Sequence, residues 1–126
     1  RKVNAAKRRV LSRFGAFVRI AARHSIRKRR RISAPGSPPS SHTGLLRRFI
    51  QFGYDDARKS VVIGPTPLRR STGEVPSLLE YGGKVRRRDR RGRFATAVYR
   101  ARPYMRPAFE REKSRLPLLW ANSIKV

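Results

Sequence analysis

Apolar and polar residues alternate with a helical period over the first 31 residues. Apolar side chains recur there at spacings of three and four, with Leu11 and Val18 beside them, at Val3, Ala6, Val10, Phe14, Phe17 and Ala21. This period predicts an amphipathic helix. Continued to Arg31, the helix would be about 45 Å long. Because a small core cannot cover that length, we expect residues 1–32 to form a basic assembly arm that partly packs against another subunit or projects.

Prolines interrupt the helical pattern between residues 33 and 43. Pro35, Pro38 and Pro39 fix the backbone φ angle and remove three amide donors, so this segment can be neither a helix nor a central strand. Gly36 supplies the unrestricted turn point within it. Segments rich in Pro, Ser and Gly are commonly linkers. We interpret residues 33–43 as a stiff connector between the helix and a body of residues 44–126.

Beyond residue 43 the pattern changes to short alternating segments separated by turn residues. Alternation predicts strands at 49–54, 60–63 and 94–100. Asp55-Asp56 is the expected turn between the first two strands. Residues 84–93 are expected to form the tip and flank of a hairpin that leads into the third strand.

Short helices are predicted around these strands. Thr43 can cap a helical turn that runs to Arg47 or Arg48, and residues 76–81 are expected to form a single turn. Pro107 suits the start of the last helix, which Pro117 kinks or ends. The expected fold class is α+β, with a long N-terminal helix, a small and mostly antiparallel β-sheet and a C-terminal helix.

The net charge of the chain adds most to what the hydrophobic pattern indicates. The 126 residues, enough for one modest domain, carry 33 Lys and Arg against seven Asp and Glu, a net charge of +26. Such a chain repels itself and needs a polyanion or acidic neighbours when it is assembled. Arginine outnumbers lysine 26 to 7. The planar guanidinium group suits phosphate and carboxylate, so this bias favours nucleic acid or packed ion pairs.

The basic residues gather in two runs that we expect to contact DNA or an acidic partner. The runs are Arg27, Lys28, Arg29, Arg30 and Arg31, and Lys84, Arg86, Arg87, Arg88, Arg90, Arg91 and Arg93. Phe94 is the one aromatic residue beside them, so base stacking is not indicated. Contact with backbone phosphates fits better. The alternative for each run is a solvated surface with counterions.

Residues for catalysis or metal binding are sparse. The pair Asp55-Asp56 has no histidine or third carboxylate nearby, and His24 and His42 without cysteine make no convincing metal site. We therefore expect no enzyme activity, no metal and no cofactor. No apolar run approaches the roughly 20 residues that span a bilayer, and no signal peptide is visible. We expect an intracellular, soluble assembly protein; a basic helix lying on a membrane surface is the lesser alternative.

Four motifs follow one another between residue 33 and about residue 115. They are Pro35-Gly36-x-Pro38-Pro39 leading to Thr43-Gly44-x-Leu46-Arg47, Val62-Ile63-Gly64-Pro65, Leu79-Glu80-Tyr81-Gly82, and Ala101-Arg102-Pro103-Tyr104-Met105-Arg106-Pro107-Ala108-Phe109. Their order resembles the tailed-bacteriophage neck family of tail-completion or tail-component proteins. The first and last motifs are the more specific ones.

The resemblance implies a non-catalytic virion protein of the head–tail junction, present in the host cytoplasm during assembly. Such proteins form a homo-oligomeric ring, a hexamer favoured and a dodecamer possible, around a channel for double-stranded DNA. The neighbours would be a portal-side connector and tail-tube or terminator proteins, with no membrane. This chain is more basic than the family pattern, so a tail-terminator or head-closure role stays open.

Two other classes fit the composition. A ribosomal protein that binds rRNA through arginine-rich segments would fit almost equally well, and a DNA-compacting protein is the third possibility. A ribosomal protein would co-purify with rRNA as one copy per particle, whereas a neck protein would form a ring in a nuclease-treated virion. The four ordered motifs favour the neck protein.

Overall fold

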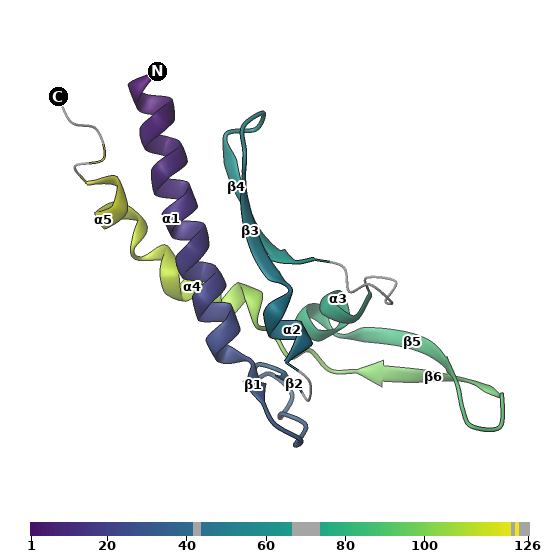
Figure 1. The fold of residues 1–126 in the computed structure, drawn as a ribbon. Helices are drawn as coiled ribbons and strands as arrows, with labels where there is room; N and C mark the ends of the chain where they lie inside the picture. Colours follow the sequence, from purple (N-terminus) through teal and green to yellow (C-terminus); the bar gives the residue numbers. More distant parts are fainter. Residues whose placement is uncertain (42–43, 67–73, 122, 124–126) are drawn as a thin grey trace.

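The computed structural model describes residues 1–41, 44–66, 74–121 and 123 (Figure 1). Its first element is the helix α1 (Lys2–Ser25), which buries one stripe of side chains with the predicted period: Ala6, Val10, Phe14, Val18 and Ala22. The helix was expected to continue to Arg31, and this expectation was wrong. Ile26 leaves the helix with extended backbone, φ −90° and ψ 108°, and its side chain is completely buried in the core.

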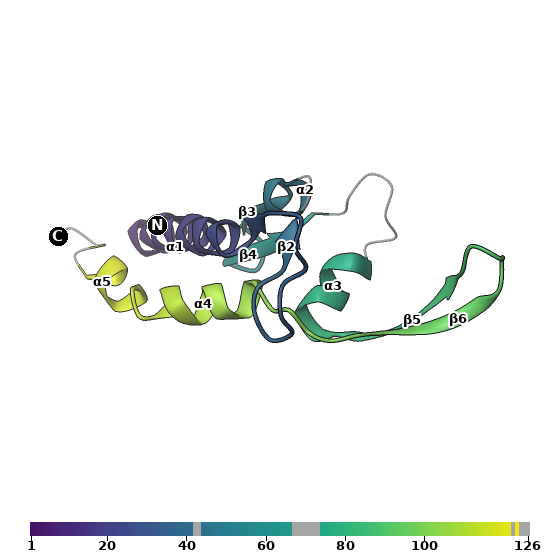
Figure 2. The ribbon, with the colours of Figure 1, turned by 90° about the horizontal axis from the view of Figure 1, so that it is seen from below.

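Helix α1 lies inside the body, so the separate arm expected for residues 1–32 was also wrong. It packs against the helices α4 (Met105–Lys113) and α5 (Leu116–Trp120) and against the strands β3 (Ile50–Asp55) and β4 (Ser60–Pro65). Figures 1 and 2 show α4 and α5 along one flank of α1 and β3–β4 along another. These neighbours within the same chain cover the apolar stripe, part of which we had expected to pack against another subunit or to project.

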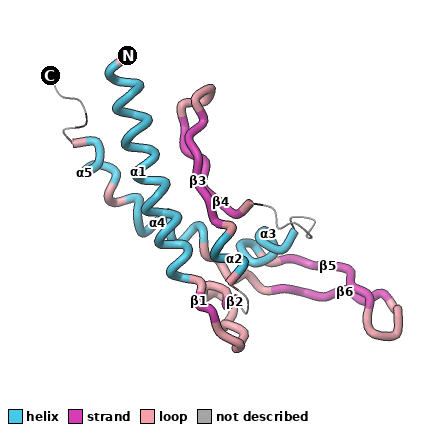
Figure 3. Tube along the Cα trace, in the orientation of Figure 1, coloured by secondary structure: helices cyan, strands magenta, loops and turns pink. Residues whose placement is uncertain are grey.

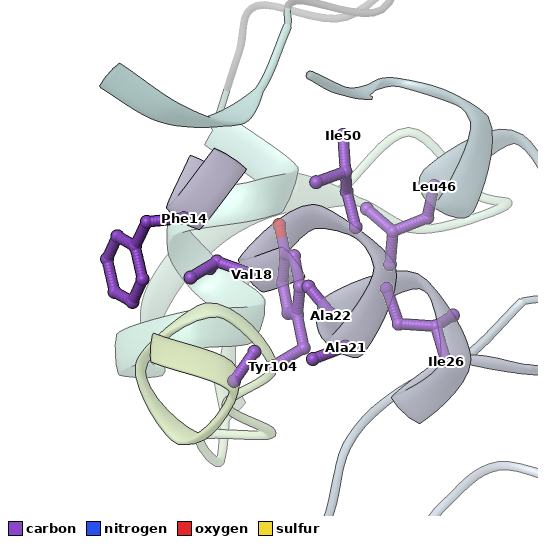
Figure 4. Close-up of a cluster of buried hydrophobic side chains, with 9 residues drawn as sticks. Phe14, Val18, Ala21, Ala22, Ile26, Leu46, Ile50 and Tyr104 are labelled. Carbon is purple, nitrogen blue, oxygen red and sulfur yellow. The ribbon is translucent and has the colours of Figure 1, made fainter. Parts of the chain in front are cut away.

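The core gathers residues from most of the chain (Figure 4). Its buried members are Phe14, Val18, Ala21, Ala22, Ile26, Leu46, Ile50, Tyr104 and Ala108. Burying one large aliphatic side chain such as Ile50 stabilises the fold by about 1.5–3 kcal/mol. Phe14 also meets Phe109 edge to face, with ring centroids 5.7 Å apart. Helix α1 is therefore held to α4 by ring contact as well as by burial.

The strands form three separate pairs in the described residues (Figure 3). Strands β3 and β4 pair antiparallel from Ile50↔Pro65 to Asp55↔Ser60, and β5 (Gly83–Arg88) pairs antiparallel with β6 (Phe94–Tyr99). Strands β1 (Arg27–Lys28) and β2 (Ser40–Ser41) form a short parallel pair. The α+β class and the antiparallel hairpins are confirmed, but the hairpins do not join into one sheet.

The turns and short helices follow the sequence closely. Asp55 Oδ1 accepts hydrogen bonds from the amides of Ala57 and Arg58 at 3.0 and 3.2 Å, which confirms the predicted turn. Helix α2 (Leu45–Arg48) is the expected turn, although its proposed cap Thr43 lies outside the described residues. Helix α3 (Glu74–Tyr81) is longer than the single turn expected.

The C-terminal helix is divided in two. Helix α4 ends at Lys113, and α5 begins at Leu116 with Pro117 in its first turn. Proline lacks an amide hydrogen, which no helix needs in its first turn. Pro117, which cannot donate a hydrogen bond to the Lys113 carbonyl four residues earlier, therefore lies where the first helix has ended and in the first turn of the second, in agreement with the expected interruption. None of the described helices has the length and apolar character needed to cross a membrane.

Candidate nucleic-acid interface

The second basic run forms an arm that projects from the body. We call strands β5 and β6 with their connecting turn the β-arm, residues 83–99; in Figures 1 and 2 it extends away from α1 and its partners. Pairing of Lys84 with Val98 and of Arg88 with Phe94 places alternate residues on one face. That face carries Lys84, Arg86 and Arg88, all exposed.

Phe94 organises two of these arginines. The guanidinium carbons of Arg86 and Arg88 lie 4.5 and 4.7 Å from the centroid of its ring. Stacking over an aromatic face stabilises a cation and leaves the in-plane N–H donors of the guanidinium group pointing outward. With two arginines over it, the ring is a platform for cations rather than a free surface for a base. The contact with backbone phosphates expected from the sequence stays a prediction.

The tip of the β-arm is ordered by its one acidic residue. Asp89 Oδ1 accepts hydrogen bonds from the amides of Arg91 and Arg93 at 2.8 and 2.9 Å. The Asp89 amide in turn donates to the Arg93 carbonyl at 2.8 Å. The carboxylate is therefore engaged with backbone, and the side chains of Arg90, Arg91 and Arg93 remain exposed around it.

The base of the β-arm is tied to the connector and to α3. The Arg102 amide donates to the Leu79 carbonyl at 2.6 Å, and Arg102 Nε donates to the Ser33 carbonyl at 2.9 Å. The Gly36 amide, in a residue with φ of +84°, donates to the Ala101 carbonyl at 2.8 Å. Three segments far apart in the sequence thus meet just beyond β6.

Glu80 joins α3 to α4. Its Oε2 accepts hydrogen bonds from the amides of Tyr104 and Met105 at 2.9 and 3.0 Å, and its Oε1 accepts one from Arg106 at 2.8 Å. These amides belong to the N-cap residue and the first turn of α4, where no acceptor within the helix is available. A carboxylate there also interacts favourably with the helix dipole. Glu80 therefore caps α4 from a different helix.

Gly82 allows the chain to pass from α3 into the β-arm. Its φ is +71°, and a Cβ there would lie 2.8 Å from the Tyr99 carbonyl oxygen and 3.0 Å from the Ala101 nitrogen. Its amide donates to the Leu78 carbonyl at 2.8 Å, which closes the end of α3. We call the contacts of residues 33–36, 79–82 and 101–106 the motif joint.

The remaining motif residues have simpler surroundings. Leu46 and Pro39 are buried, Pro103 and Pro38 are half-buried, and Tyr81 is exposed. Pro35 and Pro107 are exposed and Gly64 is half-buried, whereas Thr43 lies outside the described residues. The first motif therefore supplies core contacts as well as stiffness.

The first basic run does not form one patch. Arg27 and Arg29 line a hollow of about 400 Å³ with Arg111, whereas Lys28, between them in the chain, lines a different hollow. Arg29 Nε also donates to Ser40 Oγ at 3.0 Å. Arg30 and Arg31 are exposed. Figure 1 places β1 away from the tip of the β-arm, so the two predicted runs are separate surfaces.

A larger and mostly apolar cavity of about 690 Å³ lies between β4, α3 and α4. Its walls include Val61, Ile63, Met105 and Phe109, and Glu80 also reaches it. The Glu80 carboxylate is already occupied by three backbone amides. Within the described residues, no group of three or more histidine or acidic side chains is placed to hold a metal ion.

Sequence reasoning missed the roles of Phe94 and Ser33. Phe94 stands directly after the basic run, and the antiparallel register that brings it opposite Arg88 is the signal that could have revealed the platform. Ser33 offers only its backbone carbonyl to Arg102, which leaves no signal in residue type.

Comparison of the chain with family models, with curated proteins and with solved structures finds no match.

Proposed function

We propose that this protein is a non-catalytic structural subunit of a virion head–tail junction, where copies form a ring around double-stranded DNA. The motif joint carries the proposal. Three of the four motifs that resemble the neck family contact one another through Glu80, Arg102 and Gly36. Mutual contact supports the interpretation that the motifs encode one fold. Their hydrogen bonds position backbone, which suits a structural subunit.

The β-arm supports the DNA part of the proposal. The exposed side chains of Arg86 and Arg88 lie over the Phe94 ring on an arm that projects from the body, a placement that suits contact with phosphate. A ring repeats each subunit's charge of +26, so DNA in the channel or acidic neighbouring rings would offset the repulsion. Phosphate contact without base reading suits a channel through which any sequence passes.

The location is tested by tagging the chain and fractionating the source cells after nuclease treatment. We expect it in tailed particles, in several copies per particle, with gold-labelled antibody at the head–tail junction. A ring in the averaged particle images would give the copy number. Recovery with ribosomal subunits at one copy per rRNA, or as a free complex with duplex DNA, would contradict the proposal and support the corresponding alternative.

The role of the β-arm is tested by charge reversal. The triple variant Arg86→Glu, Arg88→Glu, Arg91→Glu should yield heads and tails that fail to join or to deliver DNA, because three phosphate donors become repulsive. The matched control is Arg13→Glu, Arg58→Glu, Lys113→Glu, which changes the net charge equally at exposed sites elsewhere. Equal behaviour of the two variants would show that total charge, and not the β-arm, matters.

A further inference from the structure

A second basic site lies where α1 ends and α2 begins. The side chains of Arg23, Lys28, Arg47 and Arg48 line a hollow of about 370 Å³ together with Gly44. We call it the arginine hollow. A Cβ at Gly44 would lie 3.9 Å from Lys28 Cδ, so the Lys28 side chain passes beside the start of α2. Residues from three separate elements therefore place four cations around one concave surface.

The backbone acceptors beside the arginine hollow are already used. Arg23 Nη2 donates to the carbonyls of Arg48 and Ile50 at 3.0 and 3.3 Å, and Arg19 Nε donates to the Ile50 carbonyl at 2.9 Å. Arg23 Nε is buried and has no hydrogen-bond partner in the described part of the chain. In the same residues, ion pairs join only Arg8 to Asp56 and Arg115 to Glu112, both outside this hollow.

The charge on Arg23 is opposed by its surroundings. Burial lowers the pKa of Arg23, and the neighbouring charges of Arg19 and Arg47 lower it further. Both causes act against the charged form of the guanidinium group. A bound anion would offset the repulsion and supply the missing counter-charge. An anion bound in the hollow formed by these residues would therefore favour the charged form of Arg23.

We propose that the arginine hollow binds a phosphate group of a nucleic-acid backbone, at a site separate from the β-arm. The guanidinium groups of Arg47 and Arg48 can each offer two parallel N–H donors to phosphate oxygens, and Lys28 adds a mobile point charge. A nucleic acid presents phosphates at close spacing along an extended chain, so one molecule can occupy several basic sites. The site holds whether or not the protein belongs to a virion neck.

The test compares two double variants by fluorescence anisotropy with a short labelled duplex of mixed sequence, at several salt concentrations. Lys28→Gln with Arg47→Gln removes two charges from the arginine hollow. The control variant, Arg58→Gln with Lys59→Gln, removes an equal number of positive charges from the exposed turn between β3 and β4. We expect the hollow variant to lose about tenfold in affinity. The slope of the logarithm of its association constant against the logarithm of the salt concentration should fall in magnitude by about 1. The affinity and the slope of the control variant should change little.

A second measurement uses inorganic phosphate alone. The thermal midpoint of the parent chain and of the control should rise in phosphate relative to chloride at equal ionic strength, and that of the hollow variant should rise less. Circular dichroism verifies folding. If the double variant does not fold, Lys28→Gln against Lys59→Gln repeats the comparison, because both lysines are exposed.

Two results would overturn the proposal. Equal losses of DNA affinity in the hollow and control variants would show that only net charge matters. A hollow variant that keeps its DNA affinity but loses binding to polyglutamate would assign the site to an acidic protein instead.

Discussion

Tyr104 carries a polar group into the centre of the core. Its side chain is almost completely buried, and its hydroxyl finds no hydrogen-bond partner among the described residues. Figure 4 shows the ring between α4 and α1 with the hydroxyl oxygen pointing into the apolar cluster. Burial, with a smaller contribution from the Glu80 charge, raises the pKa of Tyr104 to about 12. The Tyr104 hydroxyl is therefore protonated and neutral in the folded protein at neutral pH.

This pKa predicts a loss of stability at alkaline pH. Below pH 10 the hydroxyl is protonated in both the folded and the unfolded chain. Between pH 10 and about 12 only the unfolded chain ionises, so the unfolding free energy should fall, by at most about 3 kcal/mol. Denaturant titrations across this range would measure the fall. Tyr104→Phe should flatten it, and an unchanged slope in that variant would contradict the assignment.

At the scale of elements, α3 and α4 depend on each other through one side chain. Glu80 accepts three amides from the first turn of α4, where no side chain of α4 itself caps the helix. The capping signal of a helix is ordinarily sought just before it or in its first turn. Here it comes from 24 residues earlier. The separation explains why local sequence patterns cannot reveal it.

Glu80→Ala should destabilise the fold by about 2 kcal/mol, because it leaves three amides uncapped at a helix N-terminus. Glu80→Gln keeps one acceptor oxygen and should cost about half as much. Chemical denaturation measures both values. Glu110→Ala, at an exposed site on α4, is the matched control and should be near neutral. A loss in Glu80→Ala no larger than the control's would refute the capping role.

Local patterns predicted most elements, because period, turn residues and prolines act over a few positions. The stripe of α1, the Asp55 turn and the hairpin at residues 84–93 all follow from such signals. Local signals did not predict the end of α1, because Ile26 leaves the helix to join Leu46 and Ile50 in the core. The arginine hollow was missed for the same reason, because Arg23, Lys28 and Arg47 meet only after the chain has folded back.

At the scale of the whole molecule, basic surface is divided between the β-arm and the body. The β-arm holds Phe94 with its two stacked arginines, and the arginine hollow lies beside α2. The chain's seven carboxylates cannot balance 33 cations. Association with a polyanion should therefore be dominated by release of its counterions.

Affinity for duplex DNA should consequently depend steeply on salt. If about six cations meet phosphates, the logarithm of the association constant should fall with that of the salt concentration at a slope of about −5. Anisotropy or calorimetric titrations over a salt series would measure the slope, and duplexes of different sequence should give similar values. A slope near zero, or strong sequence preference, would exclude binding through backbone phosphates.

The position of α1 in the core leaves apolar surface exposed on the nascent chain during synthesis. Helix α1 is synthesised before α4 and α5, which supply Tyr104, Ala108, Leu116 and Leu119 to its apolar cluster, so its stripe stays partly uncovered until both helices have been made. Strands β3 and β4 can cover one side earlier. Until α4 and α5 have been synthesised, the 13 basic residues among the first 31 should repel other nascent chains. We therefore expect the charge of this segment to reduce aggregation of the nascent chain.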